Sequence, residues 1–268
     1  MFTETSIGQL FIAALVPAVI AVLFYFVAIG LAVRYTPNAA PSAVCEDRQE
    51  VSRALRRSVP VLLLFILVLG GLYTGIFTAT ESAAVGAFAA FFVALVRGRL
   101  GGGAFRRVMV ETVQTTAFIY GLIFGALTFA FFMNVTGVPD ALVGIVGNMD
   151  VAPLVIIAVL LVFYLALGCV MDSFGIMVIT LPAVVPLIQD LGYSLIWWGI
   201  VMVIVIETGL ITPPFGIDMF VLKSVVPDIP ITTIYRGVVP FVLSDIVKLA
   251  LVVVFPALAL WLPSTMFN

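Results

Sequence analysis

Histidine is absent from this chain, and charged residues and cysteines are scarce. Without histidine, Ser-His and Cys-His catalysis and histidine metal sites are excluded. The two cysteines, Cys45 and Cys169, lie far apart, one in a polar stretch and one in an apolar stretch, so they predict neither a disulfide framework nor a metal knuckle. No Lys/Arg-rich stretch resembles a nucleic-acid footprint, so no nucleic-acid partner is expected.

Apolar residues dominate what remains. They make up 63% of the chain, with 10% charged residues and a mean hydropathy of +1.30, whereas soluble domains contain about 45–50% apolar residues. The composition therefore predicts an all-α polytopic membrane protein, a helical bundle in which each crossing needs about 20 apolar residues. The expected apolar spans are 8–33, 60–76, 79–96, 110–133, 151–168, 170–190, 195–226 and 238–262.

The span 195–226 contains the run ETGLITPPFG from Glu207 to Gly216. Pro213 and Pro214 remove two backbone donors, and the flanking glycines permit conformations that other residues resist. In a membrane, a broken helix is tolerated only where it is buried in protein or lines a cavity. Transporters use such breaks to hold cations and anionic substrates, so the run predicts a broken helix in a solute-transport site.

The span 170–190 is interrupted by Asp172, Gly175, Pro182 and Pro186. These are too many breaks for a plain crossing helix, so we expect a re-entrant hairpin here. The basic loops 34–58 and 97–107 are expected on the cytoplasmic side, joined through two helices and a tight outer turn at 75–79. The connection 134–150, which has no Lys or Arg, is expected on the outer side.

A weak internal similarity relates residues 10–17 (LFIAALVP) to residues 233–240 (TIYRGVVP). Inverted structural repeats of this kind mark secondary transporters. An inverted repeat requires opposite orientations, whereas counting the charged loops gives the spans 8–33 and 238–262 the same orientation, and the sequence does not decide between a chance match and a miscounted span. If the match is real, the domains are 1–33, the tail of a first repeat; 34–58, a cytoplasmic loop; 59–168, scaffold helices of a second repeat; and 169–268, a transport-type hairpin, broken helix and final transmembrane helix.

Several stretches together resemble the large membrane subunit of a tripartite ATP-independent periplasmic (TRAP) transporter. They run in the family's order: residues 5–14 (TSIGQLFIAA), 75–85 (GIFTATESAAV), Met171-Asp172 with Pro182 and Pro186, 209–216 (GLITPPFG) and 255–263 (FPALALWLP). Family members also have further N-terminal helices, a serine-rich first hairpin and a first Pro-Pro break. The chain is thus similar to a C-terminal portion, with an incomplete first repeat, and we expect a truncated or split permease.

This resemblance implies an elevator-type, inverted-repeat ion transporter in the bacterial inner membrane. It implies sodium-coupled import of organic acids such as C4-dicarboxylates, with sodium as coupling ion and no other cofactor. The implied partners are a small TRAP membrane subunit, a periplasmic solute-binding protein and the lipid bilayer. The alternatives are a non-transporting remnant, half of a split permease, or another ion-coupled secondary transporter; an intramembrane enzyme lacks its signature residues.

Asp172 is the leading candidate for a sodium ligand, because a carboxylate within the membrane is costly and sodium prefers oxygen ligands. Its structural alternative is to cap the helix that begins near Ser173. Thr212 is the second expected sodium ligand. The whole expected ion and substrate site comprises Asp172, Ser173, Thr208, Gly209, Thr212, Pro213 and Pro214.

The remaining polar and aromatic residues near these segments have more ordinary explanations. Glu207 and Asp218 flank the break and could face the cavity or pair with Lys223 or Lys248. Thr78 and Glu81 have the spacing of a capping box. The indoles at 197 and 198 are expected to anchor the broken helix at the membrane interface.

Overall fold

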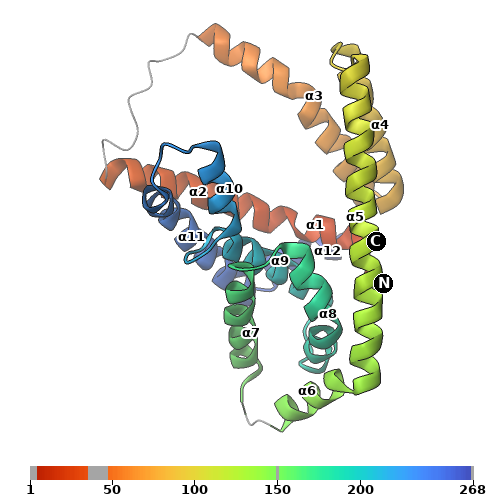
Figure 1. The fold of residues 1–268 in the computed structure, drawn as a ribbon, viewed down its shortest axis with the longest axis vertical. Coiled ribbons are helices and arrows are strands. Elements are labelled where there is room, and N and C mark those ends of the chain that lie inside the picture. Colours follow the sequence, from red (N-terminus) through yellow and green to blue (C-terminus); the bar gives the residue numbers. More distant parts are fainter. Residues whose placement is uncertain (1–4, 36–47, 149–150, 267–268) are drawn as a thin grey trace.

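The computed structural model describes residues 5–35, 48–148 and 151–266, and these ranges contain helices without any strand (Figure 1). The helices are α1 (Ile7–Ala13), α2 (Leu15–Tyr35), α3 (Arg48–Tyr73), α4 (Ala79–Val96), α5 (Gly102–Thr136), α6 (Val138–Gly147), α7 (Pro153–Gly168), α8 (Ser173–Asp190), α9 (Leu195–Ile211), α10 (Ile217–Val225), α11 (Ile231–Val254) and α12 (Ala257–Ser264). Cys45 lies outside the described residues.

Five helical stretches within these ranges are long and apolar enough to cross a membrane. They are Ile7–Tyr35, Ala79–Val96, Gly102–Thr136, Ser173–Asp190 and Ile231–Val254. Much of their surface is apolar and exposed, as expected of helices that face lipid or further protein. The all-α polytopic membrane fold predicted from composition is therefore confirmed.

The helix that follows the tight turn at 75–79 has the predicted bounds and the predicted cap. The backbone N–H of Thr78 donates to Glu81 Oε2 (2.8 Å), and the backbone N–H of Glu81 donates to Thr78 Oγ1 (3.3 Å). This reciprocal pair satisfies two amide donors that the first turn of α4 would leave free.

Several boundaries differ from those expected. Helix α3 begins at Arg48, inside the expected loop 34–58, and α6 lies inside the expected connection 134–150. Helix α6 begins after Gly137, whose φ of 67° turns the chain out of α5. The last span divides into α11 and α12 because the residue before Pro256, Phe255, takes a non-helical conformation with φ −119° and ψ 77°.

The expected hairpin within 170–190 is wrong, because Ser173–Asp190 is one helix, α8. The chain instead reverses between α7 and α8, within residues 169–172, so that α7 ends and α8 begins at the same end of the two helices (Figure 1). Pro182 and Pro186 lie inside α8 without ending it. Within protein-packed membrane helices, the backbone groups that a proline frees are satisfied by neighbours, so proline is a weaker stop signal than in water.

Helix α9 lies at the centre of the packing and contacts α1, α7, α8, α10, α11 and α12. Trp197 and Trp198 are each only 1% exposed, and Trp197 Nε1 donates to the carbonyl oxygen of Val252 (2.9 Å). Trp198 packs edge-on against Tyr164 of α7. The predicted interfacial role of the two indoles is therefore wrong: they fill the core, where their large apolar surface is removed from lipid and water.

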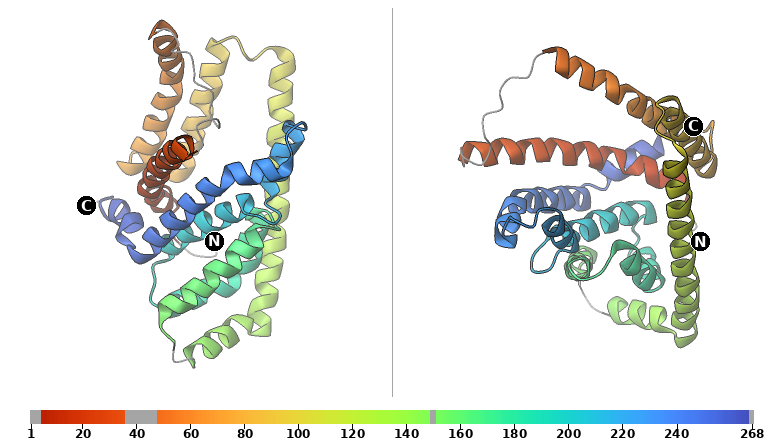
Figure 2. Two further views of the ribbon diagram at one scale, coloured as in Figure 1. Left: turned by 90° about the vertical axis from the view of Figure 1, so that its left-hand side faces the viewer. Right: turned by 45° about the horizontal axis from the view of Figure 1, so that its top comes forward.

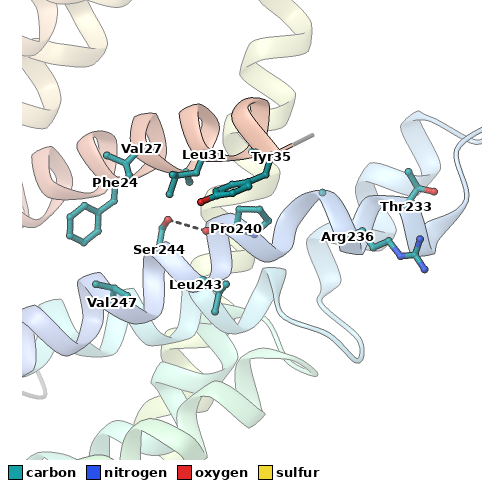
Figure 3. A pocket seen from close by; sticks show the side chains of 13 residues that line it. Phe24, Val27, Leu31, Tyr35, Thr233, Arg236, Pro240, Leu243, Ser244 and Val247 are labelled. Carbon is teal, nitrogen blue, oxygen red and sulfur yellow. Dashed lines mark hydrogen bonds between the residues drawn. The ribbon is translucent and has the colours of Figure 1, made fainter. Parts of the chain in front are cut away.

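Helices α2 and α11 lie side by side and run in opposite directions. Tyr35, at the end of α2, lies beside the first half of α11, whereas Phe24 lies beside Val247 in its second half (Figure 3). The segment 233–240 lies in the first half of α11, and the segment 10–17 runs from α1 into the start of α2. The two similar segments thus belong to antiparallel helices, which is the relation that an inverted repeat requires. Counting the charged loops gives the spans 8–33 and 238–262 the same orientation. That result is wrong, because the count treats 170–190 as a hairpin that does not cross the membrane.

Helices α3 and α4 pair with each other and stand apart from the helices around α9 (Figure 2). Helix α3 contacts that group through α1 and through a hydrogen bond between the hydroxyls of Tyr73 and Thr265, which follows α12 (2.9 Å). The long helix α5 runs along one edge and contacts α6 and α8 (Figures 1 and 2). The predicted site residues all belong to the group around α9.

Candidate functional site

The break in the long apolar segment lies where the sequence predicts it. Helix α9 ends at Ile211, and α10 begins at Ile217. Thr212 is extended (φ −89°, ψ 134°), the Pro213–Pro214 peptide bond is cis, and Gly216 has a φ of 55°. The prolines supply no amide donors and Gly216 accepts a left-handed conformation, so neither half of the segment continues into the other.

The end of α7 packs directly against α9 through two glycines. A Cβ atom placed on Gly209 would lie 2.7 Å from the Cα of Gly168 and 2.9 Å from the carbonyl oxygen of Leu165. A Cβ placed on Gly168 would lie 2.8 Å from the carbonyl oxygen of Ile206. The two backbones are therefore in contact, as is usual where small residues face each other in membrane helices. This contact places the α7–α8 turn beside the break.

Polar contacts at the α7–α8 turn connect it further to α9. Asp172 caps α8, and one of its carboxylate oxygens accepts from the backbone N–H of Gly175 (2.9 Å). Ser173 Oγ donates to Glu207 Oε1 (3.1 Å). The thiol of Cys169 lies 4.0 Å from the carbonyl oxygen of Pro213. The capping alternative for Asp172 is thus confirmed. The carboxylate uses one oxygen to cap α8 and keeps the other for a further ligand.

The hydroxyl groups of α9 bond back to its own backbone. Thr208 is 1% exposed, and its Oγ1 donates to the carbonyl oxygen of Ile204 (2.7 Å). Thr212 Oγ1 donates to the carbonyl oxygen of Thr208 (2.6 Å), and the backbone N–H of Thr212 donates to that of Gly209 (3.0 Å). Each hydroxyl oxygen retains lone pairs that a cation could use.

The structure brings most of the predicted site together, but it does not join its two expected sodium ligands by a hydrogen bond. Asp172 bonds within the first turn of α8, and Thr212 bonds within the last turn of α9. Glu207, which is the link between the turn and α9, was only a secondary candidate. Its polarity inside an apolar run was the signal available in the sequence.

Tyr235 of α11 is a site residue that the sequence did not indicate. Its hydroxyl group lies within hydrogen-bond distance of the carbonyl oxygens of Phe215 (2.6 Å) and Pro214 (3.2 Å). Both carbonyls belong to the break and have no helical partner there. A single tyrosine in an amphipathic approach to a helix carries no pattern that reveals this contact.

The lysines do not pair with the acids that flank the break. Lys223 Nζ donates to the carbonyl oxygens of Pro227 (2.6 Å) and Ile229 (2.7 Å), and Lys248 pairs with Asp245 (2.6 Å). Asp218 lies in the first turn of α10, where the helix dipole favours a negative charge. Of the alternatives open for Glu207 and Asp218, pairing with a lysine is therefore not the one found among the described residues.

A large cavity of the described structure is lined by residues of α2 and α11 and not by residues of the break. It has a volume of about 1170 Å³, lies between α2 and α11, and is lined mainly by apolar side chains with Arg236 near one end (Figure 3). None of the predicted site residues lines it. The break, by contrast, gathers the carboxylate, hydroxyl and carbonyl oxygens that hard cations require.

Comparison with known proteins shows the family of the chain. Residues 1–258 match the family described as "Tripartite ATP-independent periplasmic transporter, DctM component". The chain is 34% identical to the C4-dicarboxylate TRAP transporter large permease protein DctM of Pseudomonas aeruginosa, over 98% of this chain and 61% of that protein. It is 30% identical to the sialic acid TRAP transporter large permease protein SiaM of Vibrio cholerae, over 97% of this chain and 61% of that protein.

A further relative is the ectoine/5-hydroxyectoine TRAP transporter large permease protein UehC of Ruegeria pomeroyi, 28% identical over 99% of this chain and 62% of that protein. The chain thus spans about three-fifths of the length of these curated relatives. The substrates in the names of these relatives differ, so the family does not fix the substrate. The chain belongs to the DctM family of large permease subunits of tripartite ATP-independent periplasmic transporters.

Proposed function

We propose that this chain supplies the α7–α8 turn and broken-helix site of a sodium-coupled transporter that imports organic acids such as C4-dicarboxylates. The observation that carries the proposal is the backbone contact between Gly168 and Gly209, which sets the turn against the break. Carboxylate, hydroxyl and main-chain oxygens of two helix ends then lie near one another. Such half-helix ends are what transporters use to hold coupling cations and substrates.

The charges at the site favour cation coupling. Asp172 and Glu207 are both carboxylic side chains, and neither is part of an ion pair in the described residues. A dicarboxylate approaching these groups would be repelled unless a cation neutralised them first. A sodium ion held near Asp172 and Thr212 would remove that repulsion. The substrate carboxylate would then face the N-terminal end of α8, where the helix dipole is positive.

The proposed partners follow from the tripartite family. They are a periplasmic solute-binding protein that delivers the organic acid and a small membrane subunit that lies beside this one in the bacterial inner membrane. We propose an elevator movement in which the helices around α9 move relative to the α3–α4 pair. The separation of that pair from the rest of the fold supports this division (Figure 2).

The test is sodium-driven uptake of labelled organic acids into proteoliposomes. The chain is reconstituted with its small subunit and binding protein, with and without the N-terminal two-fifths of a relative supplied as a separate polypeptide. Sodium-dependent uptake in either arrangement supports the proposal, and uptake only with the added portion would show that the chain acts as half of a split permease. Uptake that is unchanged when sodium is replaced by choline would refute sodium coupling.

A further inference from the structure

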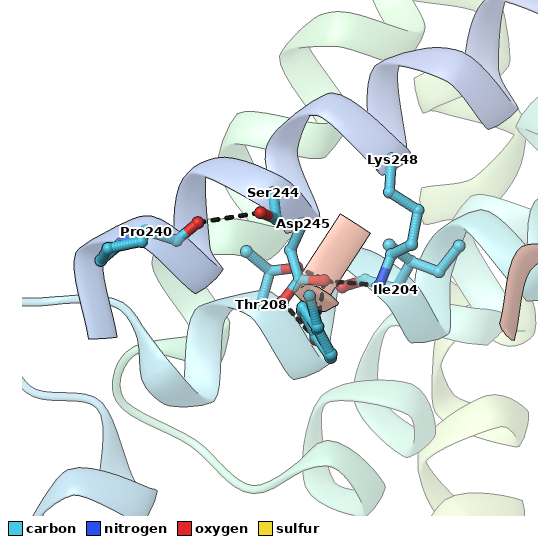
Figure 4. Close-up of polar contacts among 7 residues, drawn as sticks. Ile204, Thr208, Pro240, Ser244, Asp245 and Lys248 are labelled. Atoms are coloured by element: carbon cyan, nitrogen blue, oxygen red, sulfur yellow. Dashed lines mark hydrogen bonds and ion pairs between the residues drawn. The ribbon is translucent and has the colours of Figure 1, made fainter. Parts of the chain in front are cut away.

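A buried charged cluster joins α2 to α11. The ammonium group of Lys248 lies 2.6 Å from Asp245 Oδ1. Tyr25 of α2 lies 2.9 Å and 3.0 Å from the two oxygens of the same carboxylate and donates its phenolic proton to it. Asp245 is 4% exposed and Lys248 is 9% exposed. Figure 4 shows Asp245 and Lys248 on the face of α11 that looks toward Ile204 and Thr208 of α9.

The arrangement around the Lys248 ammonium is that of a bound cation. A carboxylate oxygen lies on one side of it, and the ring of Tyr25 lies 5.9 Å away from Nζ. Carboxylate oxygens and aromatic faces are both groups that attract cations in places with little water. The ammonium ion can donate three hydrogen bonds, and the carboxylate takes one of them.

A carboxylate in this position cannot stay charged and alone. Within membrane helices an ionised side chain is costly, and removal of one partner from a buried pair leaves an uncompensated charge. Asp245 therefore requires a positive partner, and in this chain that partner is covalently attached one helical turn away. The other charged and polar groups nearby are satisfied elsewhere: Ser244 Oγ donates to the carbonyl oxygen of Pro240 (2.9 Å), and Thr208 Oγ1 donates to that of Ile204.

We propose that the Asp245 carboxylate is an intramembrane cation site whose occupant is the chain's own Lys248 ammonium group. The site takes no coupling ion from solution while the lysine is present. Lys248 then acts as a positioning residue, because it neutralises the carboxylate through which Tyr25 holds α2 against α11. This assignment is independent of the proposed substrate and of sodium binding at the break.

A small cavity gives a free cation a place to enter when the lysine is shortened. A space of about 290 Å³ lies between α1, α2 and α9, and Lys248 is the single charged side chain among the residues that line it. The other lining residues are apolar, and they include Ala18 and Ile204. Truncation of Lys248 would join this space to the Asp245 carboxylate. A primary alkylammonium ion has the shape and charge of the part removed.

The test is thermal unfolding of the purified full chain with Lys248→Ala, measured in propylammonium chloride and in N-methylglucamine chloride of equal ionic strength. The bulky N-methylglucamine cation is the control for salt effects. At a tenfold excess of propylammonium over its dissociation constant, occupancy of one site should raise the Tm of the variant by about 3–6 °C. The matched control is Lys248→Ala combined with Asp245→Asn, which removes the carboxylate and should show no such rise.

The proposal is overturned if propylammonium raises the Tm of Lys248→Ala no more than it raises the Tm of the native chain or of the double variant. A second variant, Lys248→Met, keeps most of the side-chain volume and guards against simple loss of packing. If Lys248→Met folds only after Asp245→Asn is added, whatever cation is present, the carboxylate accepts no free cation and the pair is a structural ion pair alone.

Discussion

Substitution of Gly209 by alanine should separate α9 from α7 and weaken both the fold and the site. The added Cβ would lie 2.7 Å and 2.9 Å from the Cα and carbonyl carbon of Gly168, and 2.9 Å from the carbonyl oxygen of Leu165. All three are backbone atoms, so no side chain can rotate away. Carbon atoms in contact prefer about 3.5–4.0 Å, so the helices must move apart by about 1 Å at this crossing.

The size of the effect follows from this displacement. Overpacking by one methyl group in a tight contact costs about 1–3 kcal/mol, which for a chain of this length lowers the Tm by about 2–12 °C. The same movement would lengthen the Ser173–Glu207 hydrogen bond, which is 3.1 Å in the native chain. Thermal unfolding of the purified chain measures the first effect, and the apparent sodium affinity of uptake in a complete transporter measures the second.

The matched control is Gly121→Ala in α5. Nothing lies within 4 Å of a Cβ at Gly121, and alanine favours a helix over glycine by about 1 kcal/mol. We therefore expect the Tm of this control to stay level or rise. A Gly209→Ala variant that unfolds at or above the native temperature, with unchanged sodium affinity, would refute the close crossing and its role in the site.

Three further predictions concern the turn and the break. Asp172→Ala should lower the Tm, because it removes a helix cap worth about 1 kcal/mol, and it should also weaken the sodium dependence of uptake. Asp172→Asn keeps the cap and should weaken the sodium dependence alone. Unchanged sodium dependence in uptake assays would reject the ligand role. Alanine at both Pro213 and Pro214 should straighten the segment and abolish uptake, so normal uptake by that variant would exclude the break as the site. Tyr235→Phe removes a hydroxyl group that contacts two carbonyl oxygens of the break, so it should cost about 1 kcal/mol of stability and lower the Tm. The control is Tyr120→Phe, on the exposed face of α5, which should leave the Tm unchanged.

The break and the capping box could be predicted because their causes are local. Two prolines without amide donors end a helix wherever the surrounding protein lies, and Thr78 with Glu81 satisfies the first turn of α4 by itself. The hairpin within 170–190 was wrong for the opposite reason. Pro182 and Pro186 are tolerated inside α8 because of the helices packed around it, and the sequence does not show those neighbours.

The candidate site was predicted residue by residue, but not as an arrangement. Asp172, Ser173 and Thr212 were chosen as oxygen donors in an apolar setting, which is a property of single residues. The links between them, through Glu207 and the crossing at Gly209, join positions that are distant in sequence. Such contacts leave no periodic signal along the chain.

The sequence by itself determined the class of the protein, the place of the broken helix and the family, because apolar content, backbone donors and motif order are properties of the chain alone. Only the tertiary structure decided that α2 and α11 run antiparallel, that Trp197 lies in the core, and that Asp245 finds Tyr25 across 220 residues. These outcomes depend on which helix faces which. In a chain whose helices are apolar on most sides, that choice is made by packing between the helices, and it cannot be deduced from the hydrophobic pattern.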